Sequence, residues 1–315
     1  MSTTAADPVT LVQISDLHFP DTAGVRGFVQ HDPDAGLAAV LGHAAGAIAA
    51  ASLVVATGDL ADLGEPGAYE RLGDVLDAVP APVYCLSGNH DRNDAYRACL
   101  PRRNVHLETA VRVGSWLMLF LDSNARGRED AGDGTYRDRD DRMTAAEQPE
   151  LTPAEAAQAR AILEATSAEH VFVWLHHPPL PDIAPDAQGD TELAKLVRDF
   201  PKIRALGAGH LHGDLHGTFE GRPVFVCPST TYSIDYAGRV FDGPSYRTYT
   251  LHADGTVESE ALTVPGDITD TMRAKPAPKF LTDLMMGRIT LEEMRELTDA
   301  EFEERFGEPR PTRGA

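Results

Sequence analysis

The segment GAGHLHGDLHG, residues 207–217, places three histidines within seven residues. Imidazole nitrogens bind transition metals, but histidines in a glycine-rich loop are also often only solvated. Similar donor atoms recur in the segments SDLH, TGDL, SGNHD and LHHPP, which supply Asp16, His18, Asp59, Asn89, His90, Asp91, His176 and His177. Nitrogen and oxygen donors without thiolates favour Mn, Fe, Zn or Co over an iron–sulfur cluster or a calcium site.

Each of these segments stands at the end of an apolar run of strand length. Such runs span residues 9–15, 52–58, 82–88, 115–122, 170–176, 203–209 and 223–229. Helical patterns alternate with them, at 34–50, 65–78, 154–165 and 190–199, and the third opens with Thr152 and Glu155 in the spacing of a capping box. Near-continuous apolar strands that alternate with helices predict an α/β domain whose strands are covered on both faces.

Five strand ends therefore deliver Asp, Asn or His to one edge of the predicted sheet, where open α/β sheets bind their ligands. Asp16 and His18 are two residues apart, as are His210 and His212, so each pair points to one face of an extended backbone. These strand ends offer seven or more candidate ligands, which are too many for one catalytic ion with an open position. Two ions about 3.5–4 Å apart, bridged by one carboxylate, account for them.

The motifs DxH, GD, GNHD, HHP and GHxH, in this order, resemble those of the calcineurin-like metallophosphoesterase superfamily over roughly residues 9–260. The longer segments GDLADLGEPGAYERL, GNHDRNDAYRACLP, HHPPLP and GHLHGDLHGTFEGRPVFVCPSTTY resemble the bacterial class III cyclic-nucleotide phosphodiesterases and their glycerophosphodiesterase relatives. The resemblance implies an α/β fold that is a four-layer α/β/β/α sandwich of two mixed β-sheets, with the metals at the sheet edge.

The resemblance also implies a role for each motif residue. The seven ligand positions of the family are filled by residues of the expected type: Asp16, His18 and His212 for a first ion, Asn89, His176 and His210 for a second, and Asp59 as the bridge. His90 would stand beside the leaving group, with Asp91 as its orienting partner. His177 and His216 match no ligand position, and Asp62 is expected to stabilise a turn.

A phosphodiesterase is the function that this resemblance implies. The substrate would be a small phosphodiester such as 3′,5′-cyclic AMP, attacked in line by a hydroxide that bridges two transition-metal ions (Fe, Mn, Zn or Co). Three alternatives stay open: a phosphomonoesterase, a DNA exonuclease, or a non-catalytic interaction module of the same fold. The net charge of −21 argues against a nucleic-acid polymer as partner, and a non-catalytic module would lack ligands, whereas none is missing.

Two segments stand apart from the α/β pattern. Residues 124–150 are charged and aperiodic, which predicts a long surface loop at the mouth of the pocket. We expect residues 1–264 to form the catalytic domain and residues 265–315 a C-terminal tail of short helices. Capping boxes are predicted there at Thr290 with Glu293 and Thr298 with Glu301. The apolar stripes behind them need a partner, either the catalytic domain or a second subunit in a homodimer.

The composition also bounds the location of the chain. No apolar run approaches the ~20 residues that cross a bilayer, and the N-terminal segment lacks the charge and apolar pattern of a signal peptide. Three widely spaced cysteines are typical of buried thiols in a reducing compartment. We expect a cytoplasmic protein without a membrane span.

Overall fold

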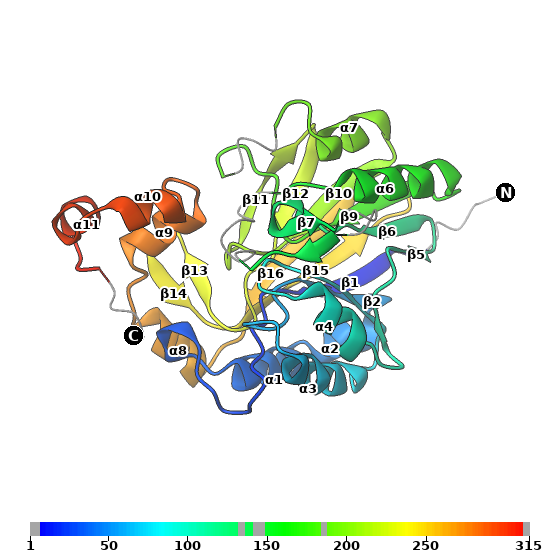
Figure 1. Cartoon of the computed structure of the whole chain (residues 1–315). Coiled ribbons are helices and arrows are strands. Elements are labelled where there is room, and N and C mark those ends of the chain that lie inside the picture. The colour runs from blue at the N-terminus through cyan, green and yellow to red at the C-terminus, as the bar shows by residue number, and fades with distance from the viewer. Residues whose placement is uncertain (1–6, 132–135, 141–148, 184–187, 311–315) are drawn as a thin grey trace.

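Two six-stranded β-sheets pack face to face, and helices cover both outer faces (Figure 1). The computed structural model describes residues 7–131, 136–140, 149–183 and 188–310. Both sheets mix parallel and antiparallel pairs, with the strand orders β16-β15-β1-β2-β3-β4 and β11-β12-β10-β9-β6-β5. The predicted α/β/β/α sandwich of two mixed sheets is therefore confirmed.

The first sheet is built around a parallel core. Its strands are β1 (Val9–Ile14), β2 (Leu53–Thr57), β3 (Val83–Leu86), β4 (Val105–His106), β15 (Ser245–Leu251) and β16 (Val257–Thr263). The helices on its outer face are α1 (Pro33–His43), α2 (Ala45–Ala50), α3 (Pro66–Asp77) and α4 (Asn93–Cys99). The α1 helix begins where Asp32 accepts a hydrogen bond from the Ala35 N–H and proline takes the first turn.

The second sheet carries its helices on the opposite side of the molecule. Its strands are β5 (Ala110–Val113), β6 (Trp116–Phe120), β9 (His170–Trp174), β10 (Ile203–Ala208), β11 (Leu215–Phe219) and β12 (Arg222–Val226), and its helices are α6 (Pro153–Ala165) and α7 (Glu192–Asp199). Thr152 caps α6 as predicted, but the Glu155 carboxylate does not complete the capping box. It instead accepts a hydrogen bond from the Asp122 N–H, 3.0 Å away.

A layer of aromatic side chains fixes the two sheets against each other. Phe172 and Trp174 stack with ring centroids 4.2 Å apart, and Tyr249 meets both rings edge to face. Within this layer the Gln13 amide donates to Thr57 Oγ1 (2.7 Å) and to the carbonyl oxygen of Ala208 (2.9 Å). These bonds tie β1 to the last residues of β2 and β10, so three strands that lead into the predicted metal ligands share one rigid connection.

Two small hairpins and a helical tail complete the described chain. The predicted irregular loop at 124–150 contains a short hairpin, β7 (Arg128–Asp130) and β8 (Tyr136–Asp138), whereas residues 132–135 and 141–148 lie outside the described residues. A second hairpin, β13 (Ser233–Asp235) and β14 (Val240–Asp242), lies next to the tail (Figure 1). The tail comprises α8 (Asp267–Arg273), α9 (Lys279–Met285), α10 (Leu291–Glu296) and α11 (Asp299–Phe306). Both capping boxes predicted there are present.

Candidate metal centre

The strand ends of both sheets meet in one group of donor atoms. Four sets of three ligand atoms lie within 4.8 Å of one another, and the sets overlap: Asp16, His18 and His212; His18, Asp59 and His90; Asp16, Asp59 and His176; His176, His177 and His210. The first sheet supplies its donors from the ends of β1, β2 and β3, and the second from the ends of β9 and β10. The convergence expected from the sequence is thus found in the structure.

The donor atoms form two halves with Asp59 between them. In the first half, His18 Nε2 lies 3.1 Å from His212 Nε2. In the second half, which His210 joins, His176 Nε2 lies 3.0 Å from Asn89 Oδ1. Asp59 Oδ2 is 3.8 Å from His18 Nε2 and 3.3 Å from His176 Nε2. One carboxylate therefore faces both halves, which is the position that a bridging ligand needs.

The backbone at these positions is strained. Five predicted ligands have left-handed φ angles: Asp16 (53°), His18 (43°), Asp59 (49°), His210 (70°) and His212 (53°). Non-glycine residues in this region cost of order 1–3 kcal/mol each, and such residues cluster at functional sites. Hydrogen bonds from the Asp16 and His18 N–H groups to the carbonyl oxygens of Gly58 and Asp59 hold two of them in place.

Glycine makes room for the carboxylates. A Cβ on Gly88 would collide with the carboxylate of Asp59, and one on Gly209 would lie 2.8 Å from Asp16 Oδ2. The glycines that precede Asn89 and His210 are therefore required by the close approach of these carboxylates.

Each of three imidazoles is oriented through its Nδ1 atom. His18 Nδ1 lies 3.2 Å from the Asp62 carboxylate, His176 Nδ1 lies 2.8 Å from the Thr57 carbonyl oxygen, and His212 Nδ1 lies 3.1 Å from the Tyr232 carbonyl oxygen. Carbonyl and carboxylate oxygens only accept, so Nδ1 carries the proton and Nε2 offers its lone pair to the centre. Metal-bound histidines are normally oriented in this way.

Burial and charge together make the group suited to cations. Burial raises the pKa of Asp16 to about 6 and lowers the pKa of His210 to about 3, and it lowers the pKa of His212 well below its usual range. Burial also opposes the charge on Asp59, yet the neighbouring imidazoles of His176 and His90 hold its pKa well below the usual range. Burial opposes the charge on His176 too, but the Asp59 carboxylate raises its pKa to about 9. Imidazoles beside buried carboxylates are the donor set that a divalent transition-metal ion needs, so the residues fit metal ions.

His90 and Asp91 occupy different surroundings. His90 Nδ1 lies 2.7 Å from the carbonyl oxygen of Asp62, and its Nε2 atom lies 4.0 Å from Asp59 Oδ2. The Asp91 carboxylate accepts hydrogen bonds from the N–H groups of Leu60, Ala61 and Gly88 and from the Tyr69 hydroxyl. These contacts brace the loops that carry Asp59 and Asn89. That Asp91 orients His90 stays a prediction, while the Asp62 carbonyl is a partner that the sequence did not indicate.

The remaining histidines of the motifs divide as follows. His216 has a side chain that is 72% exposed and lies 3.9 Å from Asp214, outside the four donor sets. His177 is buried and joins the set of His176 and His210, with Nδ1 held 2.9 Å from Ser123 Oγ. No role was predicted for Ser123, because a serine at a strand end belongs to no metal motif. Its hydroxyl also accepts the backbone N–H groups of His176 and His177.

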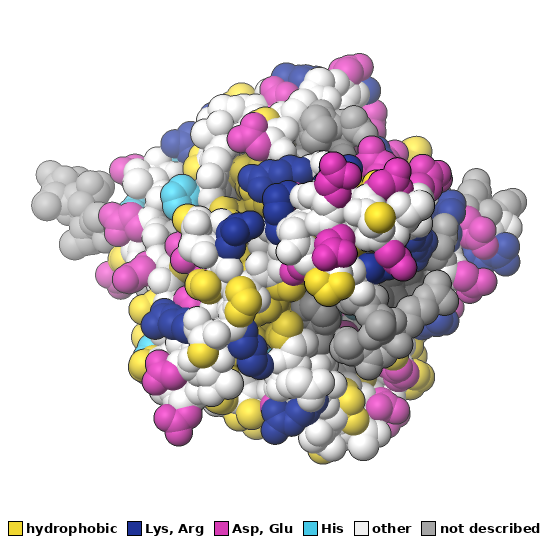
Figure 2. Space-filling view, turned by 90° about the vertical axis from the view of Figure 1, so that its left-hand side faces the viewer, with side chains coloured by type: hydrophobic (Ala, Val, Ile, Leu, Met, Phe, Trp, Pro, Cys, Tyr) yellow, Lys and Arg dark blue, Asp and Glu magenta, His cyan; other side chains and the backbone are white. Residues whose placement is uncertain are grey.

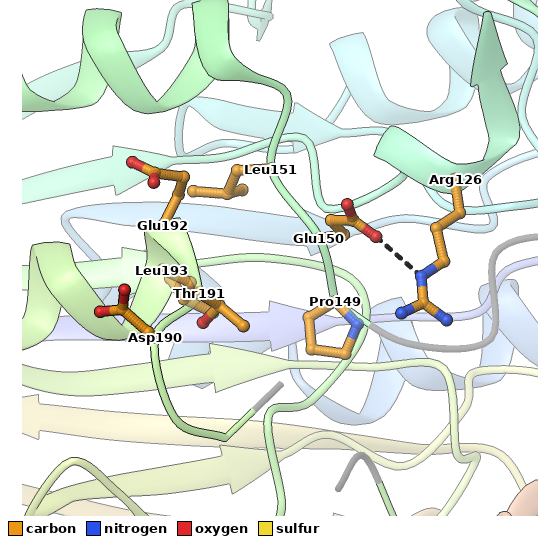
Figure 3. Close-up of a pocket in the computed structure, with 8 residues that line it drawn as sticks. All are labelled: Arg126, Pro149, Glu150, Leu151, Asp190, Thr191, Glu192 and Leu193. Carbon is orange, nitrogen blue, oxygen red and sulfur yellow. Dashed lines mark hydrogen bonds and ion pairs between the residues drawn. The ribbon is translucent and has the colours of Figure 1, made fainter. Parts of the chain in front are cut away.

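A hollow of about 340 Å³ lies beside the segments that flank residues 149–151 and 190–193 (Figure 3). Arg126 pairs with Glu150 across it at 2.7 Å, and Asp190 and Glu192 add two further carboxylates. None of the predicted metal ligands lines this hollow. Three carboxylates against one arginine would repel a phosphate, so this hollow is not where a phosphoester would react.

The chain is similar over most of its length to proteins of known family. The model of the calcineurin-like phosphoesterases matches residues 9–214. The chain belongs to the calcineurin-like phosphoesterase family. The superfamily predicted from the five motifs is thereby confirmed, as is the prediction that the chain is a phosphoesterase.

Relatives of this phosphoesterase carry more specific names. It is 29% identical to the 3′,5′-cyclic adenosine monophosphate phosphodiesterase CpdA of Escherichia coli K12 over 66% of the chain and 73% of the relative. It is 30% identical to a protein of Rhodococcus erythropolis described as a probable cyclic nucleotide phosphodiesterase, over 71% of the chain and 72% of the relative. These names agree with the branch of the superfamily that the sequence resembles.

Solved structures support the fold alone. The protein GAP50 of Plasmodium superposes with a TM-score of 0.51 at 12% identity, over 83% of the chain and 87% of GAP50. A candidate 5′-nucleotidase of Staphylococcus aureus superposes with a TM-score of 0.51 at 16% identity, over 89% of the chain, which spans 58% of that structure. None of the helices within the described ranges combines the length and apolar character needed to cross a bilayer.

Proposed function

We propose that the chain is a metal-dependent phosphodiesterase for small phosphodiesters, with 3′,5′-cyclic AMP as the first substrate to test. The observation that carries the proposal is the place of Asp59, whose Oδ2 atom faces His18 Nε2 at 3.8 Å and His176 Nε2 at 3.3 Å. A shared carboxylate between two donor sets supports a centre of two ions, with Asp16, His18 and His212 on one side and Asn89, His176 and His210 on the other. The names of the relatives support the diester substrate.

When bound, two such ions lower the pKa of a water molecule and offset the charge that develops on a phosphoryl group. The protein supplies the geometry for this chemistry. The Nδ1 contacts of His18, His176 and His212 keep three Nε2 atoms turned inward. The left-handed backbone at residues 16, 18, 59, 210 and 212 sets the direction of these donors before substrate arrives. The ligands therefore need to move little during the reaction.

His90 is the residue that we assign to the leaving group. Its Nδ1 atom is fixed by the Asp62 carbonyl oxygen, which turns Nε2 toward Asp59 and the centre. When the imidazole carries a proton on both nitrogens, Nε2 can give one from this position to a departing alkoxide. Asp91, whose carboxylate braces the surrounding loops, would act on the reaction through the placement of His90 and Asn89.

The acidic balance of the chain bears on the alternative substrates. The net charge of −21 disfavours a DNA exonuclease, because gripping a polymer needs a basic surface along many phosphates. Figure 2 shows that Lys and Arg side chains do gather among hydrophobic side chains on the face that holds the tail, while Asp and Glu side chains dominate its margins.

One assay separates the candidate functions. Metal-depleted protein is supplied with Mn²⁺, Fe²⁺, Zn²⁺ or Co²⁺ and tested on a chromogenic bis-ester, its matching monoester, cyclic AMP and single-stranded DNA. We expect hydrolysis of the bis-ester and of cyclic AMP, only with metal. Preferred hydrolysis of the monoester or of DNA would replace the proposal by the corresponding alternative, and metal binding without any hydrolysis would favour the non-catalytic module. Metal content measured on the same preparation gives the number and identity of the ions. Cytoplasmic location and a homodimer stay predictions.

A further inference from the structure

The segment that carries His210 and His212 is held from outside by the β13–β14 hairpin. The Ile234 N–H donates to the carbonyl oxygen of His212 at 2.7 Å, and the Tyr236 hydroxyl donates to the carbonyl oxygen of Leu211 at 2.5 Å. The hairpin lies beyond residue 214, where the match to the family ends. The support of the histidine motif therefore comes from residues outside the matched segment.

Tyr236 is well placed to fix the backbone between the two histidines. Leu211 lies between His210 (φ 70°) and His212 (φ 53°), both left-handed. The Tyr236 ring packs over Gly213, where an added Cβ would lie 2.7 Å from Tyr236 Cε2. Burial raises the pKa of Tyr236 well above its usual range, so the hydroxyl keeps its proton and serves as a donor.

Residues 273–277 and the helices α8 and α9 hold the hairpin in place. The Phe241 N–H donates to the carbonyl oxygen of Lys275, and the Ala277 N–H donates to the carbonyl oxygen of Arg239. Arg273 pairs with both carboxylate oxygens of Asp242 at 2.8 and 3.2 Å. The helices α8 and α9 close over the hairpin through a cluster of apolar side chains, Ile234, Phe241, Met272, Ala277, Leu281 and Met285. Tyr236 is thus anchored on its far side and cannot follow the histidine segment if that segment relaxes.

We propose that Tyr236 is a positioning residue for the metal centre: its hydroxyl holds the backbone of residues 210–212 in the geometry that presents both imidazoles to the ions. The inference rests on the metal centre of the proposed function and adds a residue outside the family motifs. Loss of a supporting partner of a metal ligand typically weakens metal affinity by about 10–100-fold. For one neutral hydrogen bond to a backbone carbonyl we expect the lower end of that range, roughly tenfold.

The test compares Tyr236→Phe with a matched control in the full chain. Tyr246→Phe also removes one tyrosine hydroxyl. Tyr246 is buried on the helical side of the first sheet, and its hydroxyl lies 3.1 Å from His43 Nδ1. Each metal-depleted protein is titrated with Co²⁺ and followed by visible absorption, which reports the coordination geometry. Tyr236→Phe should bind Co²⁺ about tenfold more weakly with an altered spectrum, and Tyr246→Phe should match the parent protein.

The outcomes separate this inference from the proposed function. Parent-like affinity and spectrum in Tyr236→Phe would overturn the positioning role, and so would an equal loss in Tyr246→Phe, since that would mark a general effect on stability. Failure of the parent chain to bind Co²⁺ would instead refute the metal centre itself. Binding by the parent chain without hydrolysis of any phosphoester would refute the proposed function and leave the role of Tyr236 standing.

Discussion

The two halves of the metal centre are supported in different ways. In the second half, His176 is fully buried, and its Nδ1 atom binds a carbonyl oxygen at the end of β2, a strand that Gln13 ties to β10 inside the core. In the first half, His18 is held by the Asp62 side chain, which is 46% exposed, and His212 by a carbonyl oxygen of the segment that leads into the β13–β14 hairpin. His176 of the second half is thus supported by main chain of the sheet core, whereas His18 and His212 of the first half depend on a half-exposed side chain and on the segment before the hairpin; residues 210–212 serve both halves.

This difference predicts unequal metal affinities. Supports made of backbone within a sheet move little and cannot be removed by a side-chain substitution, while a half-exposed carboxylate can shift. We therefore expect the second half to bind its ion more tightly than the first, and to keep it during partial metal depletion.

The largest effect is expected where the halves join. Asp59→Ala removes the carboxylate that faces both, so hydrolysis should fall by on the order of 10⁴-fold or more and both ions should be lost on dialysis. Activity and metal content are measured on one preparation. His216→Ala is the control, because that exposed imidazole lies outside the donor sets, and it should behave as the parent chain. Equal damage from both variants would refute the bridging position of Asp59.

His90 separates proton donation from metal binding. His90→Ala should keep its metals, lose on the order of 10²–10⁴-fold on an alkyl or cyclic-nucleotide diester, and lose little on an aryl diester, since a nitrophenolate leaves without a proton. Both substrates are assayed on the same metal-loaded protein, so a folding defect would lower both rates together. Equal losses would instead assign His90 to positioning of the phosphate.

A substitution at Asp62 tests whether the two halves of the centre are supported independently. Asp62→Asn keeps the backbone carbonyl that fixes His90 but weakens the acceptor of His18, so we expect about 10-fold weaker binding of one ion and unchanged binding of the other. Titration of metal-depleted protein with Mn²⁺ resolves the two steps. Asp182→Asn, at an exposed carboxylate outside the four donor sets, serves as the control. Equal weakening of both steps would show that the halves are not supported independently.

The smallest expected effect is a change in stability with pH, at the end of β6. There the Glu155 carboxylate accepts a hydrogen bond from the N–H of Asp122, the residue before Ser123. Burial raises the pKa of Glu155 to about 7. The hydrogen bond from the Asp122 N–H and the Arg97 charge lower this pKa by less, and the Asp122 charge adds to the rise. Because the folded pKa exceeds the unfolded value, this group stabilises the fold at low pH and loses that contribution as pH rises from about 4.5 to about 7.

Glu155→Gln removes this titration and retains an acceptor. Between pH 5 and pH 8 the parent chain should lose on the order of 1 kcal/mol more unfolding free energy than the variant, after allowance for solvent screening. Urea denaturation at both pH values measures the difference. Parallel pH dependence in the two proteins would show that Glu155 does not titrate in this range.

Much of the fold could be predicted because the seven apolar runs are long and strongly patterned, and all of them are strands in the structure. Short or half-exposed elements gave weaker signals. The helix α4 follows the GNHD motif with only Tyr96 as a buried residue, and β7 and β8 are three residues each and charged, so neither shows a period that can be recognised. The predicted helix 34–50 divides at Ala44, where an alanine gives no sequence signal of a break.

The ligand motifs were readable because each combines a metal-binding side chain with a strand end. The residues that orient those ligands were not. Thr57 and Tyr232 contribute main-chain carbonyls, and any residue type provides one of these. Ser123 and Tyr236 contribute hydroxyls from distant segments, and their partners are fixed only by the tertiary fold.

The five left-handed ligands have a consequence for how such chains diverge. Asp and His adopt φ near +50° more often than most residues but less freely than Gly, so each of these positions carries a conformational cost that Gly would avoid. Glycine at any one of the five would relieve that cost and at the same time remove a donor atom from the centre.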